Sequence, residues 1–224
     1  MIKGLLKKDL YNLATYKTSL IIIILFCSIA IIGTESITIA PAIICGIVGM
    51  ISLSTFSYDE ISKSNKYILT LPTDRKELVK EKYILAIVAT VLGGILGMVL
   101  TIIVVNIMNY LRPENIITLD YKSLVISTLG GIFAISFLQS VQIPSIYKWG
   151  AEKGRIQMFI LVLIIVAILG GIYFLINKTN INIDMEMIKN FINKFGVWIL
   201  IISTVIMYYI SYKIAYKIYK NKEE

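Results

Sequence analysis

The run YILAIVATVLGGILGMVLTIIVVNIM, residues 83–108, carries no charged side chain along its whole length. A helix needs about 20 apolar residues to cross the roughly 30 Å hydrocarbon core of a bilayer. Other uncharged runs lie on both sides of it, and 57% of the 224 residues are hydrophobic whereas 16% are charged. Soluble domains are about 25% charged. The composition therefore predicts an all-α integral membrane protein whose main solvent is lipid.

Apolar runs separated by charged breaks predict six transmembrane helices in a single membrane domain that covers residues 1–224. The first two spans are joined only by residues 33–36, so we expect a tight helical hairpin, with one long or re-entrant segment as the alternative. We place the six spans near 18–35, 38–57, 83–108, 123–146, 157–176 and 197–215.

The distribution of basic residues predicts the orientation, because short loops rich in Lys and Arg stay in the cytoplasm. Of the 22 Lys and Arg residues, 17 fall on the side that would hold both termini and 5 fall on the other side. We therefore expect both termini inside, in the plasma membrane. The net charge is +8, and the basic residues lie between and beside the apolar runs instead of on one exposed face. Anionic lipid headgroups are therefore the expected partner, and nucleic acid is not.

Two amphipathic helices are predicted outside the bilayer core. Residues 1–17 form the first, which we expect to lie on the inner leaflet, although a solvated basic tail is the alternative. Its apolar face would hold Ile2, Leu5, Leu6, Leu10 and Leu13. Between the fifth and sixth spans, Asp184 as an N-cap and Gly196 as a C-terminal stop predict a short helix at the outer face. That helix could be an extracellular gate or an interfacial loop.

The largest cytoplasmic loop covers residues 58–82 and is interrupted by Leu71 and Pro72, since proline removes an amide donor and restricts the residue before it. After this break, Asp74 and Glu77 form a plausible capping box for a helix that continues into the third span. Before it lies a short helix candidate of mixed charge, which either docks on a partner or is a solvated connector. Its polar residues are Asp59, Glu60, Lys63, Lys66 and Tyr67.

The chain offers little for catalysis. It has no histidine, and both Cys27 and Cys45 fall inside apolar runs, so we expect no metal site. It also lacks a phosphate-binding GxxxxGK[ST] loop and an intramembrane acidic pair, so a non-catalytic chain without its own cofactor is predicted. No ionisable residue lies clearly at a span centre, which argues against proton-coupled transport.

Small and amide residues inside the spans are expected to hold the helices together. Gly93 and Gly97 form a GxxxG pair, which indicates close helix packing and is only weak evidence for dimerisation. Hydrogen bonds between helices are favoured over substrate contact for Asn106, Gln139 and Gln142.

Two loop motifs resemble those of small ATP-binding-cassette type 2 (ABC-2) exporter permeases. The first, DEISKSNKYILTLPTDRKELVKEKY at 59–83, has the family's acidic pair, Tyr-containing helix, Leu-Pro break and Arg-Lys-Glu helix. The second is PSIYKWGAEKGR at 144–155, in which Pro144, Tyr147, Lys148, Trp149, Gly150, Glu152, Lys153 and Arg155 match. Ser64 departs from the pattern where an aromatic is usual, and Gly154 where Ala is usual.

The resemblance implies a permease that pairs with a second permease copy or a paralogue and with two cytoplasmic ATPase subunits, which would bind the ATP and Mg²⁺. Residues 59–71 would be the coupling helix, hinged at Leu71 and Pro72. The implied activity is export of an amphipathic or hydrophobic cargo, a peptide, lipid or drug. The alternatives are a non-transporting membrane anchor or sensor on the same scaffold and, more distantly, an intramembrane enzyme.

Overall fold

The computed structural model describes residues 2–34, 36–64, 74–113, 116–179 and 185–222, and within helices it leaves some side chains undescribed, including those of 175–194. Over these ranges the regular structure is entirely helical, as the sequence predicts. The helices are α1 (Ile2–Ala14), α2 (Lys17–Thr34), α3 (Ile39–Ser52), α4 (Ser54–Ile61), α6 (Arg75–Leu111), α7 (Tyr121–Trp149), α8 (Ala151–Thr179) and α9 (Met185–Lys220).

Four segments of the described chain are long and apolar enough to cross a membrane, by length and composition. They are Ile39–Ile61, Arg75–Leu111, Tyr121–Trp149 and Phe195–Lys220. The pair Lys3–Ala14 and Lys17–Gly33, bent by 61°, raises the number to five if it forms one broken span. The protein is therefore multi-pass, while six spans and the cytoplasmic position of the termini stay predictions.

Helix boundaries differ from the expected ones at three places. Helices α3 and α4 meet at Leu53, which itself has helical dihedral angles, so they act as one span. Asp74 does precede α6, but its side chain makes no capping bond. The expected stop at Gly196 is wrong, because α9 continues through it to Lys220. Gly196 is followed by the apolar sequence Val-Trp-Ile-Leu, which favours continuation of the helix. The expected N-cap Asp184 lies outside the described residues.

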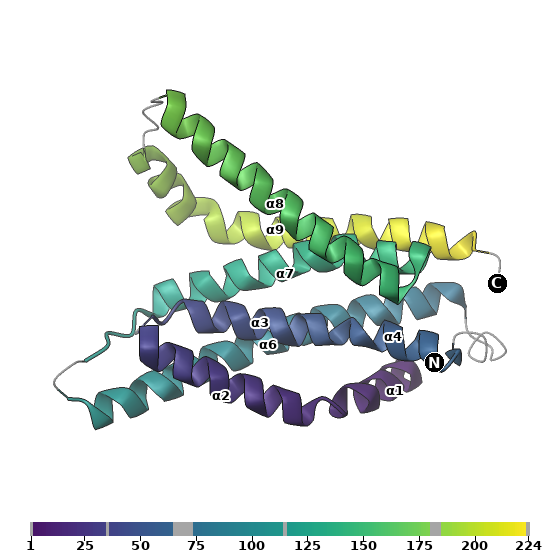
Figure 1. Ribbon diagram of the computed structural model, residues 1–224, viewed down its shortest axis with the longest axis horizontal. Helices are drawn as coiled ribbons and strands as arrows, with labels where there is room; N and C mark the ends of the chain where they lie inside the picture. The colour runs from purple at the N-terminus through teal and green to yellow at the C-terminus, as the bar shows by residue number, and fades with distance from the viewer. Residues whose placement is uncertain (1, 35, 65–73, 114–115, 180–184, 223–224) are drawn as a thin grey trace.

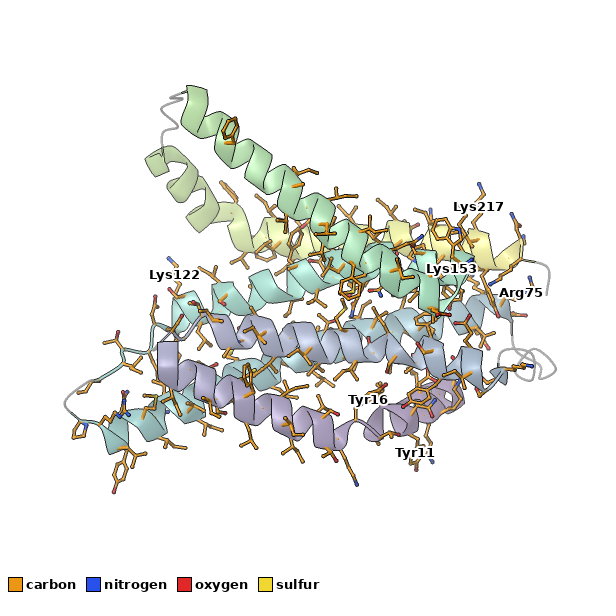
Figure 2. All side chains as sticks on the ribbon, viewed as in Figure 1. Tyr11, Tyr16, Arg75, Lys122, Lys153 and Lys217 are labelled. Atoms are coloured by element: carbon orange, nitrogen blue, oxygen red, sulfur yellow. The ribbon has the colours of Figure 1, made fainter. Side chains whose placement is uncertain are left out.

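The basic ends of the helices gather as the sequence predicts. In Figure 1, α1 and the C-terminal end of α9 lie at the same end of the bundle. Figure 2 shows Arg75, Lys153 and Lys217 at this end and Lys122 at the opposite one. We call it the basic end. The predicted cytoplasmic segments therefore share one side of the molecule.

Close helix packing in the centre depends on glycines of α6 and α7. A Cβ on Gly97 would lie 2.8 Å from the Cα of Pro41, and one on Gly93 would lie 2.9 Å from the Cβ of Val48. A Cβ on Gly131 of α7 would lie 2.9 Å from the Cα of Ala42. The GxxxG pair thus packs α6 on α3 within one chain, and α3, α6 and α7 pack on one another in this region.

The apolar face of helix α1, expected to meet lipid on the inner leaflet, packs partly on the protein instead. It packs on α4 and α6, and Leu5 is buried in a core cluster with Leu53 and Phe56. Leu10, expected on the same apolar face, is 56% exposed. One side of α1 is therefore fixed to the bundle, and the other side is free to meet lipid headgroups.

We predict that Gly97→Ala destabilises the protein, because the added methyl group would force α6 away from the backbone of α3. The expected cost is roughly 1–3 kcal/mol, measured as a lower midpoint of thermal unfolding in detergent. The matched control is Gly130→Ala, since nothing lies within 4 Å of a Cβ there. Equal midpoints for the two variants would contradict this packing.

Candidate functional site

A cluster of charged side chains lies buried at the basic end, where α1, α4 and α6 meet. The ammonium of Lys82 on α6 lies 2.5 Å from Asp9 Oδ2 on α1 and 2.5 Å from Asp59 Oδ2 on α4. Asp9 is 0% exposed, Asp59 4% and Lys82 7%. A buried charge is costly unless it is paired, so these three residues fix the relative positions of the three helices. We call Lys8, Asp9, Asp59 and Lys82 the ion cluster.

Lys8 completes the ion cluster from its more exposed side. Its ammonium lies 2.5 Å from Asp59 Oδ1 and 3.2 Å from Asp9 Oδ1. Burial alone would lower the pKa of Lys8, but the hydrogen bond to Asp59 and the negative charges of Asp59 and Asp9 raise it above its usual value. Ser64 also donates to Asp59 Oδ1, at 2.8 Å. Ser64, the last described residue before residues 65–73, thus contacts the cluster.

Neighbouring groups complete the surroundings of Lys82. Its ammonium donates to Thr55 Oγ1 at 3.1 Å and lies 5.1 Å from the ring centroid of Phe56, close enough for a cation–π contact. Glu81, 2% exposed, lines the same small cavity as Lys8 and Lys82. Two ammonium groups, of Lys8 and Lys82, therefore lie near three carboxyl groups. Asp9 and Asp59 balance the two positive charges, and Glu81 is the third acid.

The two loop motifs meet at Glu60. Helix α7 ends at Trp149 and α8 begins at Ala151, so Gly150 alone turns the chain, with φ +91°, a value that favours glycine. The Ala151 amide donates to Glu60 Oε2 at 2.8 Å, so a carboxylate from α4 caps the start of α8. A Cβ on Gly150 would lie 2.7 Å from Glu60 Oε1. Because Gly150 has no side chain, the Glu60 carboxylate has room to cap α8.

Two basic side chains, those of Arg75 and Lys222, connect the C-terminal end of α9 to its neighbours. Arg75 at the start of α6 donates to the carbonyl oxygens of Tyr219, Lys220 and Lys222 at 2.9–3.1 Å. Lys222 in turn donates to the Tyr147 carbonyl oxygen at 3.2 Å. A cation on the last carbonyls of a helix satisfies their unpaired oxygens. Polar contacts therefore also tie α9 to α6 and α7 at the basic end.

The predicted coupling residues separate into three groups. Asp59 and Glu60 belong to the last turns of α4 and make the buried and capping contacts above, so they do not lie on a separate docking helix. Lys63, just after α4, is exposed. Lys66, Tyr67, Leu71 and Pro72 lie outside the described residues. Their role in coupling stays a prediction.

Residues of the second motif lie on both sides of Gly150. Pro144 is buried within α7, whereas Lys148, Glu152 and Lys153 are exposed. The side chain of Arg155 is not described. The exposed members flank the Gly150 turn, and Lys153 lies at the basic end (Figure 2).

The amide residues of the spans differ in role. Gln139 is 0% exposed and donates to the Gly49 carbonyl oxygen at 2.9 Å, and its own carbonyl oxygen accepts from Thr90 and from Tyr208. It thus joins α3, α6, α7 and α9, the helix-to-helix bonding that the sequence favours. Asn106, by contrast, is exposed on α6.

Sequence reasoning missed Asp9, Lys82, Lys8 and Glu81 as site residues. One signal was available for Asp9. It follows Leu5 by four residues, so a carboxyl lies on the apolar face of an amphipathic helix, where a charge needs a partner. For Lys82 the sequence offered no comparable signal, because it lies in a run of alternating charges at the start of α6.

The comparison with protein families agrees with both loop motifs. The profile of the family described as ABC-2 family transporter protein matches residues 4–220. The chain belongs to the ABC-2 transporter family. No curated protein and no solved structure matches it. In this ABC-2 chain the acidic pair Asp59 and Glu60 and the second loop motif are joined by the Glu60 contact, and the ion cluster lies next to both.

We predict that Lys82→Ala destabilises the chain by roughly 3–5 kcal/mol, because it leaves Asp9 and Asp59 buried without their shared cation. Thermal unfolding in detergent, followed by tryptophan fluorescence, measures the effect. Lys80→Ala, two residues away and exposed, is the control and should change stability by no more than about 0.5 kcal/mol. Similar losses of stability for both variants would show that Lys82 is not a buried charge paired with Asp9 and Asp59.

Proposed function

We propose that this chain is the permease subunit of an ATP-driven exporter in the plasma membrane. It would pair with a second permease copy or a paralogue and with two cytoplasmic ATPase subunits that bind ATP and Mg²⁺. The cargo would be amphipathic or hydrophobic, because the spans offer mainly apolar surface. Membership of the ABC-2 family supports the permease role.

The observation that carries the proposal is the position of the ion cluster relative to residues 65–73. The chain enters this segment after Ser64, which donates to Asp59, and leaves it into α6, which carries Lys82. Both flanks of the segment thus attach to the same buried charges. A partner that binds between them would act on α4, α6 and α1 together.

This arrangement suits the transmission of force from an ATPase. Packed helices with paired buried charges move as rigid bodies, and a rearrangement between them is the usual form of a transport transition. The Glu60 cap extends the connection to α8, and Arg75 extends it to α9. Movement at residues 59–72 would therefore reach most helices of the bundle at their basic ends.

Charge reversal at Lys63 and Lys66 tests the proposed coupling surface. We expect Lys63→Glu with Lys66→Glu to reduce ATPase copurification and the stimulation of ATP hydrolysis at least about fivefold, since each reversal turns an attraction of about 1 kcal/mol into repulsion. The measurement uses the full chain in proteoliposomes together with the proposed partner ATPase. Asp59 is left unchanged because it is buried.

Lys122→Glu, at the opposite end of the bundle, serves as the matched charge reversal. If the Lys63 and Lys66 variant kept both association and stimulation, the coupling assignment would be wrong. If the ATPase associated but no compound stimulated hydrolysis and none was transported, the non-transporting anchor or sensor would replace the exporter.

A further inference from the structure

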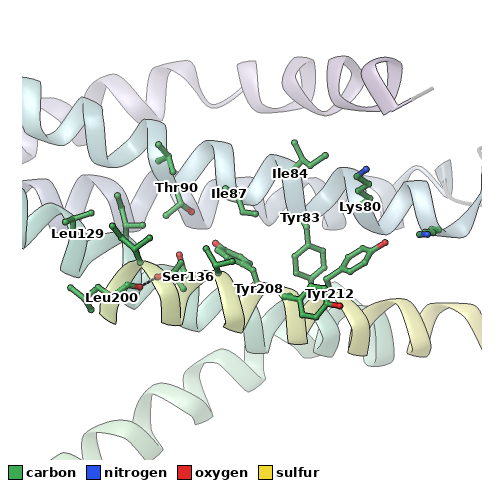
Figure 3. A pocket seen from close by; sticks show the side chains of 17 residues that line it. Lys80, Tyr83, Ile84, Ile87, Thr90, Leu129, Ser136, Leu200, Tyr208 and Tyr212 are labelled. Carbon is green, nitrogen blue, oxygen red and sulfur yellow. Dashed lines mark hydrogen bonds between the residues drawn. The ribbon is translucent and has the colours of Figure 1, made fainter. Parts of the chain in front are cut away.

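A second feature, separate from the ion cluster, is a cleft of about 780 Å³ between α6, α7 and α9. Figure 3 shows its length, with Leu129 and Leu200 toward one end and Lys80 and Tyr212 toward the other. Apolar side chains line most of it, including Ile87, which is 38% exposed, and Val205, which is 64% exposed. The described part of the chain thus leaves a long apolar surface open to the outside.

The charged groups of the cleft lie at one end. Lys76 and Lys80 lie one helical turn apart on α6, and both are exposed at the cleft. Tyr209 and Tyr212 lie nearby on α9, and the ring centroid of Tyr212 is 5.6 Å from that of Tyr83. Tyrosine is enriched at the level of lipid headgroups. The cleft is therefore amphipathic along its length, with its cationic end at the basic end of the bundle.

The length of the cleft matches one leaflet of a bilayer. At about 1.5 Å per residue, Val91 lies roughly 16 Å beyond Lys80 along α6. Along α9, Leu200 lies roughly 18 Å from Tyr212 by the same rise. Half of a hydrocarbon core is roughly 15 Å thick. A molecule with an anionic head at the lysines would place its apolar tail along the remaining lining.

We propose that this cleft binds an anionic membrane phospholipid, with the headgroup phosphate on Lys76 and Lys80 and an acyl chain between α6 and α9. The proposal goes beyond the transport function and does not depend on it. A water-soluble anion would gain nothing from the apolar lining, and a phospholipid without net negative charge would gain less than an anionic one from the two ammonium groups. A second copy of this chain fits the cationic end poorly, because it brings its own net charge of +8.

The test uses the full chain in nanodiscs with a phosphatidylglycerol analogue that carries a photoreactive diazirine in its acyl chain. We expect cross-links on peptides that contain Ile87 and Val205. Unlabelled phosphatidylglycerol should compete at least about fivefold better than phosphatidylcholine, since one lysine near a membrane surface contributes about this factor. Lys76→Gln with Lys80→Gln should remove the preference without changing the unfolding midpoint.

The matched control is Lys153→Gln with Lys217→Gln, which removes the same charge at the same end of the bundle but outside the cleft. It should keep the preference for phosphatidylglycerol. Labelling spread evenly over lipid-facing helices, with no headgroup preference, would overturn the proposal. Efficient disulfide formation between copies of the Ile87→Cys and Val205→Cys variants, with no lipid labelling there, would instead assign the cleft to a second copy. Binding is measured without the ATPase, so either result leaves the exporter proposal standing.

Discussion

Charge pairing at the basic end is the constraint on which the arrangement of the helices depends. Asp9, Asp59 and Lys82 leave water in a chain that is mostly apolar, and each would be costly to bury alone. The three come from α1, α4 and α6, and a small displacement of one helix would separate a carboxylate from the ammonium of Lys82. The cluster therefore restricts these helices to arrangements in which Asp9, Asp59 and Lys82 remain paired.

Different forces hold the middle of the bundle and its basic end. Near its middle, α6 approaches α3 closely at Gly93 and Gly97, where packing contacts replace the hydrophobic driving force that lipid removes. At the basic end, directional contacts dominate, including the Glu60 cap of α8 and the Arg75 contacts to α9. The contacts at the basic end are thus specific and can be rearranged, whereas the middle of the bundle is held by close packing.

The sequence predicted features that depend on a single segment. Hydropathy located the helices, the Gly93 and Gly97 pair indicated close packing, and Gln139 was expected to bond between helices. The ion cluster could not be predicted in this way, because Lys8 and Asp59 are 51 positions apart and Asp9 and Lys82 are 73 apart. The charge pattern placed Asp59 on a short helix that docks on a partner or is a solvated connector, and the family resemblance made it part of the coupling helix. The burial of Asp59 depends on α1 and α6, and no local sequence pattern reveals that these helices pack there. The expected helix end at Gly196 was wrong for a different reason, because the apolar residues after it continue the helix.

The most direct test of this account is a double-mutant cycle between Asp9 and Lys82, measured by thermal unfolding of the full chain in detergent. Asp9→Asn and Lys82→Gln keep the size of each side chain nearly unchanged while removing its charge. If the two charges are paired in the buried cluster, the double variant should be more stable than the sum of the single effects predicts, by roughly 1–3 kcal/mol. Additive effects, within about 0.5 kcal/mol, would contradict the claim that this pair holds α1 against α6.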